Sequence, residues 1–490
     1  MARSATPSSD GPRPPRVPTP ATTAVVACPA GDVIGVDRGG TAAFTGIRYA
    51  GVDRFRPPQD ITSWTGRVMA TGFGAQAPQN GGVLERLLGG SSFPMAEDCL
   101  FLNVFTPGCD DVRRPVLVWV HGGAYVTGTG AMPWYDGSAL AARGDVVVVT
   151  INYRLGALGF LDDHNSGTLD QVAALRWVAR NIEAFGGDAD NVTVFGESAG
   201  GSALMALMAT PAADRLFHRA IAMSPSILQL RDADQGARLA ATFLDLLGVD
   251  SIDDARMAPV DAILEAQARF PASTAGLKNF SPTSGTDVIP EPILDVAAAD
   301  PRPLVIGTNR DEMLLFTAYD HSRSDWTDAD VGREFERRFG DDAAAAITAY
   351  RSHRPDTSPS QLVSAMQTDE VFRVPAQRVG EQRSDRGNAT WMYSFDFASR
   401  AFGGVMGACH GLDIPFAFDN LSRQGAEMFT GPGDDRQRVA DQFAQAIVDF
   451  AHTGDPGWPE FERDGRATQR IGLEPAVDAD PDAELRALWR

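Results

Sequence analysis

Short apolar runs alternate with longer segments of helical periodicity from about residue 115 onward. The runs 115–120 and 146–149 are continuously apolar, which is the pattern of strands buried on both faces of a parallel sheet. Residues 191–195, 220–223 and 303–306 predict further strands of the same sheet. The alternation of strands and helices predicts βαβ crossovers, and therefore an α/β fold with a doubly wound, mostly parallel central sheet.

A helix is predicted between the second and third of these strands, and Gly186 is its expected stop. Its apolar face carries residues at helical spacing: Val172, Leu175, Val178, Ile182 and Phe185. Further helical segments near 230–300 and 318–380 are expected as insertions into the sheet domain.

The length of 490 residues allows about three ordinary domains or one large α/β domain with insertions. No internal repeat or linker interrupts the chain after residue 23, so residues 23–490 are predicted to form a single domain. Residues 1–22 are rich in Pro, Ser and Thr and are predicted to be a disordered tail. They contain no apolar run of the kind that a secretory signal requires.

Composition and charge exclude several classes of function. Lys and Arg number 43 against 64 Asp and Glu, and the formal net charge of −21 argues against a nucleic-acid partner. There is no apolar stretch of ~20 residues, so no membrane span is expected. The four cysteines have no metal-binding spacing and are too few for a disulfide framework, so a cytoplasmic protein without a metal is expected.

The central chemical signal is the segment GESAGG at residues 196–201, which fits the G-x-S-x-G pattern of a nucleophile elbow. In such an elbow a strand turns sharply into a helix, so that Ser198 Oγ stands clear of the sheet and faces the helix N-terminus. A predicted strand precedes the segment, and the helix-compatible residues 202–208 follow it. The pattern also occurs by chance, and a packing turn with an inert serine is the alternative.

A second glycine-rich segment, His121-Gly122-Gly123-Ala124, closes the first buried strand. Consecutive glycines let the backbone turn its N–H groups toward a developing oxyanion, and the N–H of Ala199 would complete an oxyanion hole. Alone, such a segment is more often a simple turn. The elbow downstream favours the catalytic interpretation.

The base and the orienting acid of a triad should follow the serine in the order Ser, acid, His. Of the seven histidines, five lie beyond Ser198, and His410 stands in a loop of small residues ahead of an apolar stretch. A lone histidine can equally have a surface or structural role. For the acid, Glu312 and Asp311 both follow a predicted strand, and the periodicity does not separate them.

The chain resembles the type-B carboxylesterase/cholinesterase family of α/β-hydrolases over roughly residues 23–490. Segments typical of the family occur in the expected order: Phe44–Ala50, Glu97–Val104, His121–Ala124, Asn152–Gly156, Phe185–Asp188, Gly196–Gly201 and Arg310–Glu312.

The resemblance implies the α/β-hydrolase fold and a serine carboxylesterase that acts on a small-molecule ester without a cofactor. It implies Ser198 as nucleophile, Glu312 rather than Asp311 as acid, and His410 as base. The oxyanion hole that it implies is formed by Gly122, Gly123 and Ala199.

The sequence departs from the family pattern at particular positions. Arg48 stands where proline is usual, a change expected to affect only an edge turn. Cys99 commonly pairs with an upstream cysteine, but residues 74–79 contain none. The tryptophan that binds choline in cholinesterases would fall at Gly89, and residues 81–92 contain no aromatic side chain. The general carboxylesterase branch is therefore expected.

Two other functions compete with ester hydrolysis. The same triad can attack an amide, a carbamate or a lactone, and pocket shape decides between them. A non-catalytic binding domain of the same fold is disfavoured because all three triad residues are present. Glu197 is expected either to position water or the leaving group or to make a structural hydrogen bond. No sequence feature names the natural ester or marks an oligomeric interface.

Overall fold

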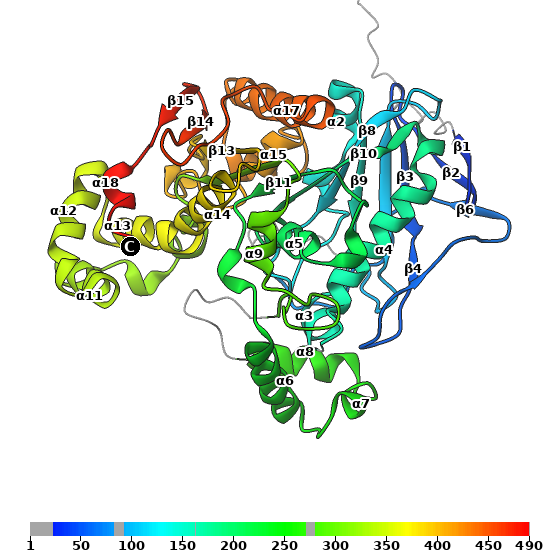
Figure 1. Cartoon of the computed structure of the whole chain (residues 1–490), viewed down its shortest axis with the longest axis horizontal. Coiled ribbons are helices and arrows are strands. Elements are labelled where there is room, and N and C mark those ends of the chain that lie inside the picture. Colours follow the sequence, from blue (N-terminus) through cyan, green and yellow to red (C-terminus); the bar gives the residue numbers. More distant parts are fainter. Residues whose placement is uncertain (1–22, 83–92, 162, 271–279, 490) are drawn as a thin grey trace, which may run out of the picture.

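The computed structural model of the chain describes residues 23–82, 93–161, 163–270 and 280–489. The tail predicted over residues 1–22 lies outside this part. Within the described residues, a 13-stranded mixed sheet runs through the molecule (Figure 1). Its parallel middle has the strand order β9-β8-β10-β11-β12-β13-β14. These strands are β8 (Arg114–Val120), β9 (Val147–Ile151), β10 (Gly187–Glu197), β11 (Arg219–Met223), β12 (Leu304–Asn309), β13 (Thr390–Phe395) and β14 (Ala467–Ile471).

Antiparallel strands extend the sheet at both ends, and β6 adds to β2 in parallel. They are β1 (Thr23–Cys28), β2 (Gly31–Asp37), β3 (Ala42–Arg48), β6 (Arg67–Met69), β7 (Phe101–Thr106) and β15 (Ala476–Ala479). A separate two-stranded sheet consists of β4 (Ala50–Gly51) and β5 (Gln59–Asp60).

Every strand predicted from the apolar runs is present, as β8, β9, β10, β11 and β12. The predicted helix is α4 (Ser166–Asn181), continued by the 3-10 turn η2 (Ile182–Phe185), and Gly186 ends it at φ 78°. The predicted α/β fold class is confirmed.

Successive residues of β8 enter different cores, which explains why this strand is apolar throughout. Val118 packs in one core together with residues of α4 and α5 (Ala199–Met208). Trp119 faces the opposite core, which α2 (Ser138–Gly144) and α17 (Arg436–Thr453) cover. Helices on both faces leave no solvated side for polar residues.

Helical insertions follow β11 and β12, near the predicted spans. After β11 come α6 (Ala233–Leu247), α7 (Ile252–Ala255), α8 (Val260–Arg269) and α9 (Ile293–Ala299). After β12 come α10 (Leu314–Thr317), α11 (Asp328–Phe339), α12 (Ala343–His353), α13 (Pro359–Thr368), the π-helical turn Asp369–Arg373 and α14 (Val374–Ser384). The remaining short helices are α3 (Gly156–Phe160), α15 (Ile414–Ala417), α16 (Ala426–Thr430) and α18 (Ala483–Arg486).

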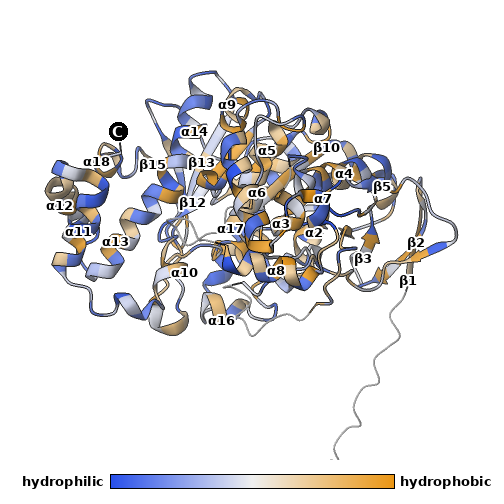
Figure 2. Cartoon of the chain, turned by 90° about the horizontal axis from the view of Figure 1, so that it is seen from below, coloured by the Kyte–Doolittle hydropathy of each residue, from blue (hydrophilic) through white to orange (hydrophobic). Residues whose placement is uncertain are grey.

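The second insertion has a small core of its own. Phe335, Tyr350 and Leu362 of α11, α12 and α13 pack there against Leu485 and Trp489 near the C-terminus. Figure 2 shows α11 and α12 at one end of the molecule with many hydrophilic residues along them. Among the described residues, no helix is long and apolar enough to cross a membrane.

Candidate active site

Ser198 occupies the sharp turn between β10 and α5. Its backbone angles are φ 58° and ψ −120°, a conformation that a residue with a side chain rarely adopts. The turn is held by backbone bonds: the N–H of Ser198 donates to the Met223 carbonyl (2.9 Å), and its own carbonyl accepts from Ser202 (3.0 Å) and Ser226 (3.2 Å). The strained serine is thus fixed by its neighbours on β11 and α5.

Glycines allow neighbouring backbones to approach this turn closely. A Cβ atom on Gly200 would lie 2.0 Å from the carbonyl oxygen of Val120 at the end of β8. A Cβ atom on Gly122 would lie 3.1 Å from Ser198 Cβ and 2.7 Å from the Glu197 carbonyl oxygen. The segment predicted to form the oxyanion hole therefore lies directly against the serine.

Buried side chains hold the segment around Gly122. Tyr153 donates from its hydroxyl to the His121 carbonyl (2.8 Å), and its ring stacks on that of His121 with centroids 4.5 Å apart. Burial lowers the pKa of His121 to about 4, so its ring is neutral and its Nδ1 donates to the Gly122 carbonyl (2.8 Å). The N–H groups of Gly122, Gly123 and Ala199 donate to no other described residue.

Glu312 and His410 are brought together although 98 residues separate them in the chain. Glu312 Oε2 lies 2.7 Å from His410 Nδ1, and Glu312 Oε1 accepts the N–H of Asn309 (2.7 Å). Both side chains are buried, so the carboxylate fixes the Nδ1–H tautomer of the ring. Phe372 and Phe316 flank the ring with centroids 4.7 and 5.5 Å away.

The neighbouring Asp311, which the periodicity left as a rival for this position, does not face His410. Its carboxylate is bound by Arg310, Arg354 and the N–H of Ala408. Only Glu312 of the two adjacent carboxylates lies against the imidazole.

Glu197, the residue before the serine, faces the other side of the ring. Its Oε1 lies 3.1 Å from His410 Nε2, and no hydrogen bond joins Ser198 to His410 in the described part of the chain. Burial raises the pKa of Glu197, and the charge of His410 opposes this rise. Burial lowers the pKa of His410, but the Glu197 and Glu312 carboxylates outweigh it and raise the value to about 9. The contact with Glu197 thus favours the charged imidazolium.

Sequence reasoning missed two polar residues beside this pair. Asn309 Nδ2 donates to the Cys409 carbonyl (2.7 Å) and approaches Asp413 Oδ1 (3.3 Å). Burial and Glu312 raise the pKa of Asp413 to about 7, and Tyr393 donates to its other oxygen (3.3 Å). The only signal was proximity, since each lies three positions from Glu312 or His410.

The strained serine, the glycine-rich segment against it and the buried Glu–His pair have counterparts in known proteins. A model of the carboxylesterase family matches residues 22–487. The chain belongs to the carboxylesterase family. The para-nitrobenzyl esterase of Bacillus subtilis (strain 168) is 36% identical over 486 residues, which cover 93% of this chain and 96% of that esterase.

Further similarities agree with this assignment. The phenmedipham hydrolase of Pseudarthrobacter oxydans is 36% identical and covers 91% of this carboxylesterase and 94% of its own length. The crystal structure of the Geobacillus stearothermophilus carboxylesterase EST55 at pH 6.2 superposes with a TM-score of 0.84 at 33% identity, covering 95% of this chain and 100% of that one. The predicted α/β-hydrolase fold and carboxylic ester hydrolase activity are thereby confirmed.

The structure locates two of the three positions at which the sequence departs from the family pattern. The expected edge turn is not found at Arg48, which is the last residue of β3, is separated from β4 by Tyr49 alone, and pairs with Asp98 (2.7 Å). Cys99 is buried and its thiol is free, as are the thiols of the other cysteines. Gly89, the position aligned with the choline-binding tryptophan, lies outside the described residues.

Proposed function

We propose that Ser198, His410 and Glu312 are the catalytic triad of this carboxylesterase. The observation that carries the proposal is the 2.7 Å contact between the buried Glu312 carboxylate and His410 Nδ1, beside a serine held at φ 58°. The order of the three residues along the chain is the one that this fold uses. Their chemistry requires neither a metal nor an organic cofactor.

In the proposed mechanism, His410 Nε2 takes the proton of Ser198 Oγ as the oxygen attacks the ester carbonyl. Glu312 keeps the Nδ1 proton on the ring and stabilises the imidazolium. The tetrahedral intermediate collapses to an acyl-enzyme, and the alcohol leaves with the proton from Nε2. Water then repeats the sequence and releases the acid. Because Nε2 faces Glu197 in the resting structure, the bond to Ser198 forms as the substrate binds.

The proposed oxyanion hole consists of the N–H groups of Gly122, Gly123 and Ala199. Its support is that these donors are unused and that Gly122 packs against Ser198. Each such donor is typically worth ~3–4 kcal/mol in the transition state. The bonds that hold His121 preorganise the loop before substrate arrives.

For Glu197 we propose an electrostatic role rather than a purely structural one. The sequence left open whether Glu197 positions water or the leaving group or makes a structural hydrogen bond, and the 3.1 Å contact with Nε2 supports a third role, an electrostatic effect on the imidazole. A carboxylate at this distance stabilises the imidazolium that forms during each proton transfer.

The acyl substrate is proposed to be a carboxylic ester, and a carbamate or an amide is the second candidate. A relative of this carboxylesterase is named phenmedipham hydrolase and another probable N-octanoylanthranilate hydrolase, so relatives act on more than one named compound. A lactone would require the same attack by Ser198. The binding-domain alternative is disfavoured, because such domains typically lose one or more triad residues, whereas Ser198, Glu312 and His410 are all present.

Residues 23–490 are proposed to be a single domain preceded by a disordered tail at 1–22. The cytoplasm is the proposed location, because the free thiols of the described cysteines suit a reducing compartment. Fractionation of the producing cell with a compartment marker tests this location.

The decisive test is hydrolysis of p-nitrophenyl butyrate by the purified protein and by Ser198→Ala and Glu312→Gln. Loss of the nucleophile should lower kcat by at least ~10³-fold, and Glu312→Gln should lower it by a comparable factor. Unchanged turnover in Ser198→Ala would overturn the triad.

A further inference from the structure

The loop after β12 and the loop that carries His410 are joined by paired backbone bonds. The N–H of Asp311 donates to the Ala408 carbonyl (3.0 Å), and the N–H of His410 donates to the Glu312 carbonyl (3.2 Å). The proposed acid and base therefore sit on two segments that form one unit.

The side chain of Asp311 makes further contacts between the same two loops. Its Oδ2 accepts the N–H of Ala408 (3.0 Å) and the guanidinium of Arg310 (2.9 and 3.0 Å), while its Oδ1 accepts from Arg354 Nη1 (2.6 Å). A Cβ atom on Gly407 would lie 2.5 Å from Oδ2, so the backbone of the His410 loop packs directly on the carboxylate. Burial raises the pKa of Asp311, but Arg310 and Arg354 outweigh it and lower the value to about 2. The carboxylate stays ionised.

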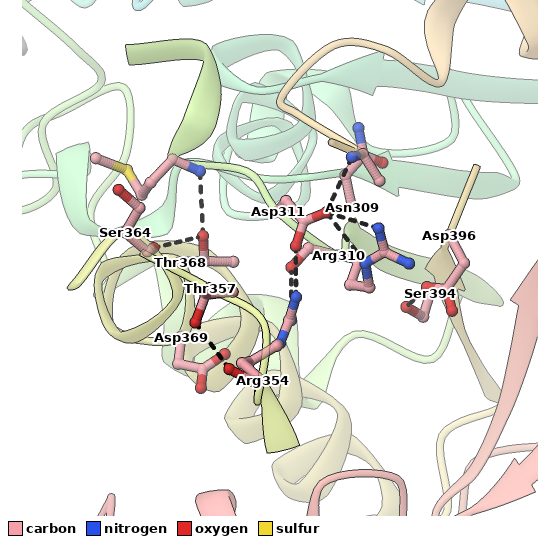
Figure 3. Close-up of polar contacts among 12 residues, drawn as sticks. Asn309, Arg310, Asp311, Arg354, Thr357, Ser364, Thr368, Asp369, Ser394 and Asp396 are labelled. Carbon is pink, nitrogen blue, oxygen red and sulfur yellow. Dashed lines mark hydrogen bonds and ion pairs between the residues drawn. The ribbon is translucent and has the colours of Figure 1, made fainter. Parts of the chain in front are cut away.

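The arginine that completes the contact comes from the second helical insertion. Arg354 follows α12, and besides Asp311 it approaches the Arg310 carbonyl (3.3 Å). Arg373, at the end of the π-helical turn, donates to the same carbonyl (2.8 Å). Figure 3 shows Arg354 reaching across to Asp311 while Arg310 approaches it from the other side. Two arginines of the insertion therefore contact the backbone directly after β12.

We propose that Asp311 is a positioning residue for the catalytic base, through which Arg354 of the helical insertion holds the His410 loop against Glu312. The proposal rests on the triad proposed above. Asp311 touches neither Ser198 nor the imidazole and acts through the backbone of Ala408. A displacement of about 1 Å in a reacting group can cost ~10²-fold in rate. A loosened loop should therefore lower kcat more than it weakens substrate binding.

The test compares Asp311→Asn with Asp300→Asn. An amide in place of the Asp311 carboxylate cannot accept from Arg354, Arg310 and Ala408 together, because one of its atoms is a donor. Asp300 is a matched control: it is equally exposed at 8%, binds the side chain and N–H of Arg302, and precedes β12 at the end away from the site. We expect kcat for p-nitrophenyl butyrate to fall ~10–100-fold in Asp311→Asn with KM within ~3-fold, and to stay near wild type in Asp300→Asn.

Two further readouts separate positioning from general destabilisation. The rate at which an organophosphate such as paraoxon modifies Ser198 should fall with kcat in Asp311→Asn, because it reports activation of the nucleophile. Arg354→Lys, which keeps one charged donor for Oδ1, should retain more activity than Arg354→Ala. Equal kcat values in Asp311→Asn and Asp300→Asn, or equal losses in the two Arg354 variants, would overturn the proposal.

Failure of this proposal can be distinguished from failure of the triad. If Glu312→Gln is inactive and Asp311→Asn is fully active, only the positioning role of Asp311 is rejected. A fully active Glu312→Gln variant rejects the triad, and with it the premise for Asp311.

Discussion

Ser198 and the Glu312–His410 pair lie in one site, but the chain holds them by different means. The elbow at Ser198 is positioned by backbone hydrogen bonds and by glycines that let β8, β10 and α5 approach one another. The proposed acid–base pair is positioned by side chains that join segments about 100 residues apart, namely Asn309 to Cys409 and Asp311 to Ala408.

Because of this difference, substitutions in the two regions should have different effects on stability and on catalysis. A substitution that forces the elbow backbones apart must disturb the central sheet itself. A substitution in the acid–base loops removes individual hydrogen bonds from segments that the sheet still carries, so it should affect catalysis more than stability. Glu197 joins the two regions, because it belongs to the elbow and faces His410.

The largest effect is expected for Gly200→Ala. Its new Cβ would meet the Val120 carbonyl oxygen at 2.0 Å, so we expect a loss of more than ~3 kcal/mol in the free energy of unfolding, measured by urea denaturation. Gly332→Ala in α11 is the control, because no atom lies within 4 Å of the position and alanine favours a helix by up to ~1 kcal/mol. If Gly200→Ala kept wild-type stability, the close backbone packing at the Ser198 elbow would not be needed for folding, and this side of the comparison would be wrong.

The next effect concerns Asn309→Ala, which removes the donor to the Cys409 carbonyl. We expect kcat to fall by ~10-fold or more, while the free energy of unfolding falls by only ~1–3 kcal/mol. Asn388→Ala removes a similar bond, to the Ala298 carbonyl (3.0 Å), away from the site and should leave kcat unchanged. If kcat fell equally in both variants, the loss in Asn309→Ala would not reflect a specific role of Asn309 in positioning the His410 loop.

A shift in pH dependence is expected for Glu197→Gln. The groups that face the imidazole are Glu197, Glu312 and Asp413, and the Glu197 charge raises the pKa of His410. The base must be neutral to act, so removing that charge lowers its pKa and should move the acidic limb of the kcat/KM profile to lower pH. Glu183→Gln, at an exposed ion pair with Arg113, should not move it. A limb that stays in place or moves to higher pH contradicts the electrostatic role.

The smallest effect is expected for Tyr153→Phe, which removes the hydrogen bond to the His121 carbonyl. We expect about 1 kcal/mol less stability and a loss in kcat below ~10-fold, measured by denaturation and by steady-state kinetics. Tyr319→Phe changes an exposed ring and should alter neither. A loss in kcat as large as that of Asn309→Ala would show that the oxyanion loop, too, depends on side-chain support.

Much of the fold was predictable because its strongest signals are local. The strands β8 and β9 are buried along their whole length, which explains the unbroken apolar runs at 115–120 and 146–149. Most of the antiparallel strands were not predicted: β2, for example, alternates buried and half-buried positions over a short length, a weaker pattern. The same division holds in the site, where Ser198 and Gly122 stand in contiguous motifs that the sequence displays.

The sequence by itself determined the parallel sheet, the serine at its elbow and the glycine segment beside it, because each depends on residues adjacent in the chain. The periodicity left Glu312 and Asp311 open and the family resemblance favoured Glu312, but only the tertiary structure shows that Glu312 faces His410 while Asp311 turns to Arg310 and Arg354. Adjacent residues at the end of a strand point in different directions, and their partners lie 98 and 43 residues away. The periodicity of the chain therefore does not encode which of the two neighbouring carboxylates meets a histidine that arrives from a distant segment.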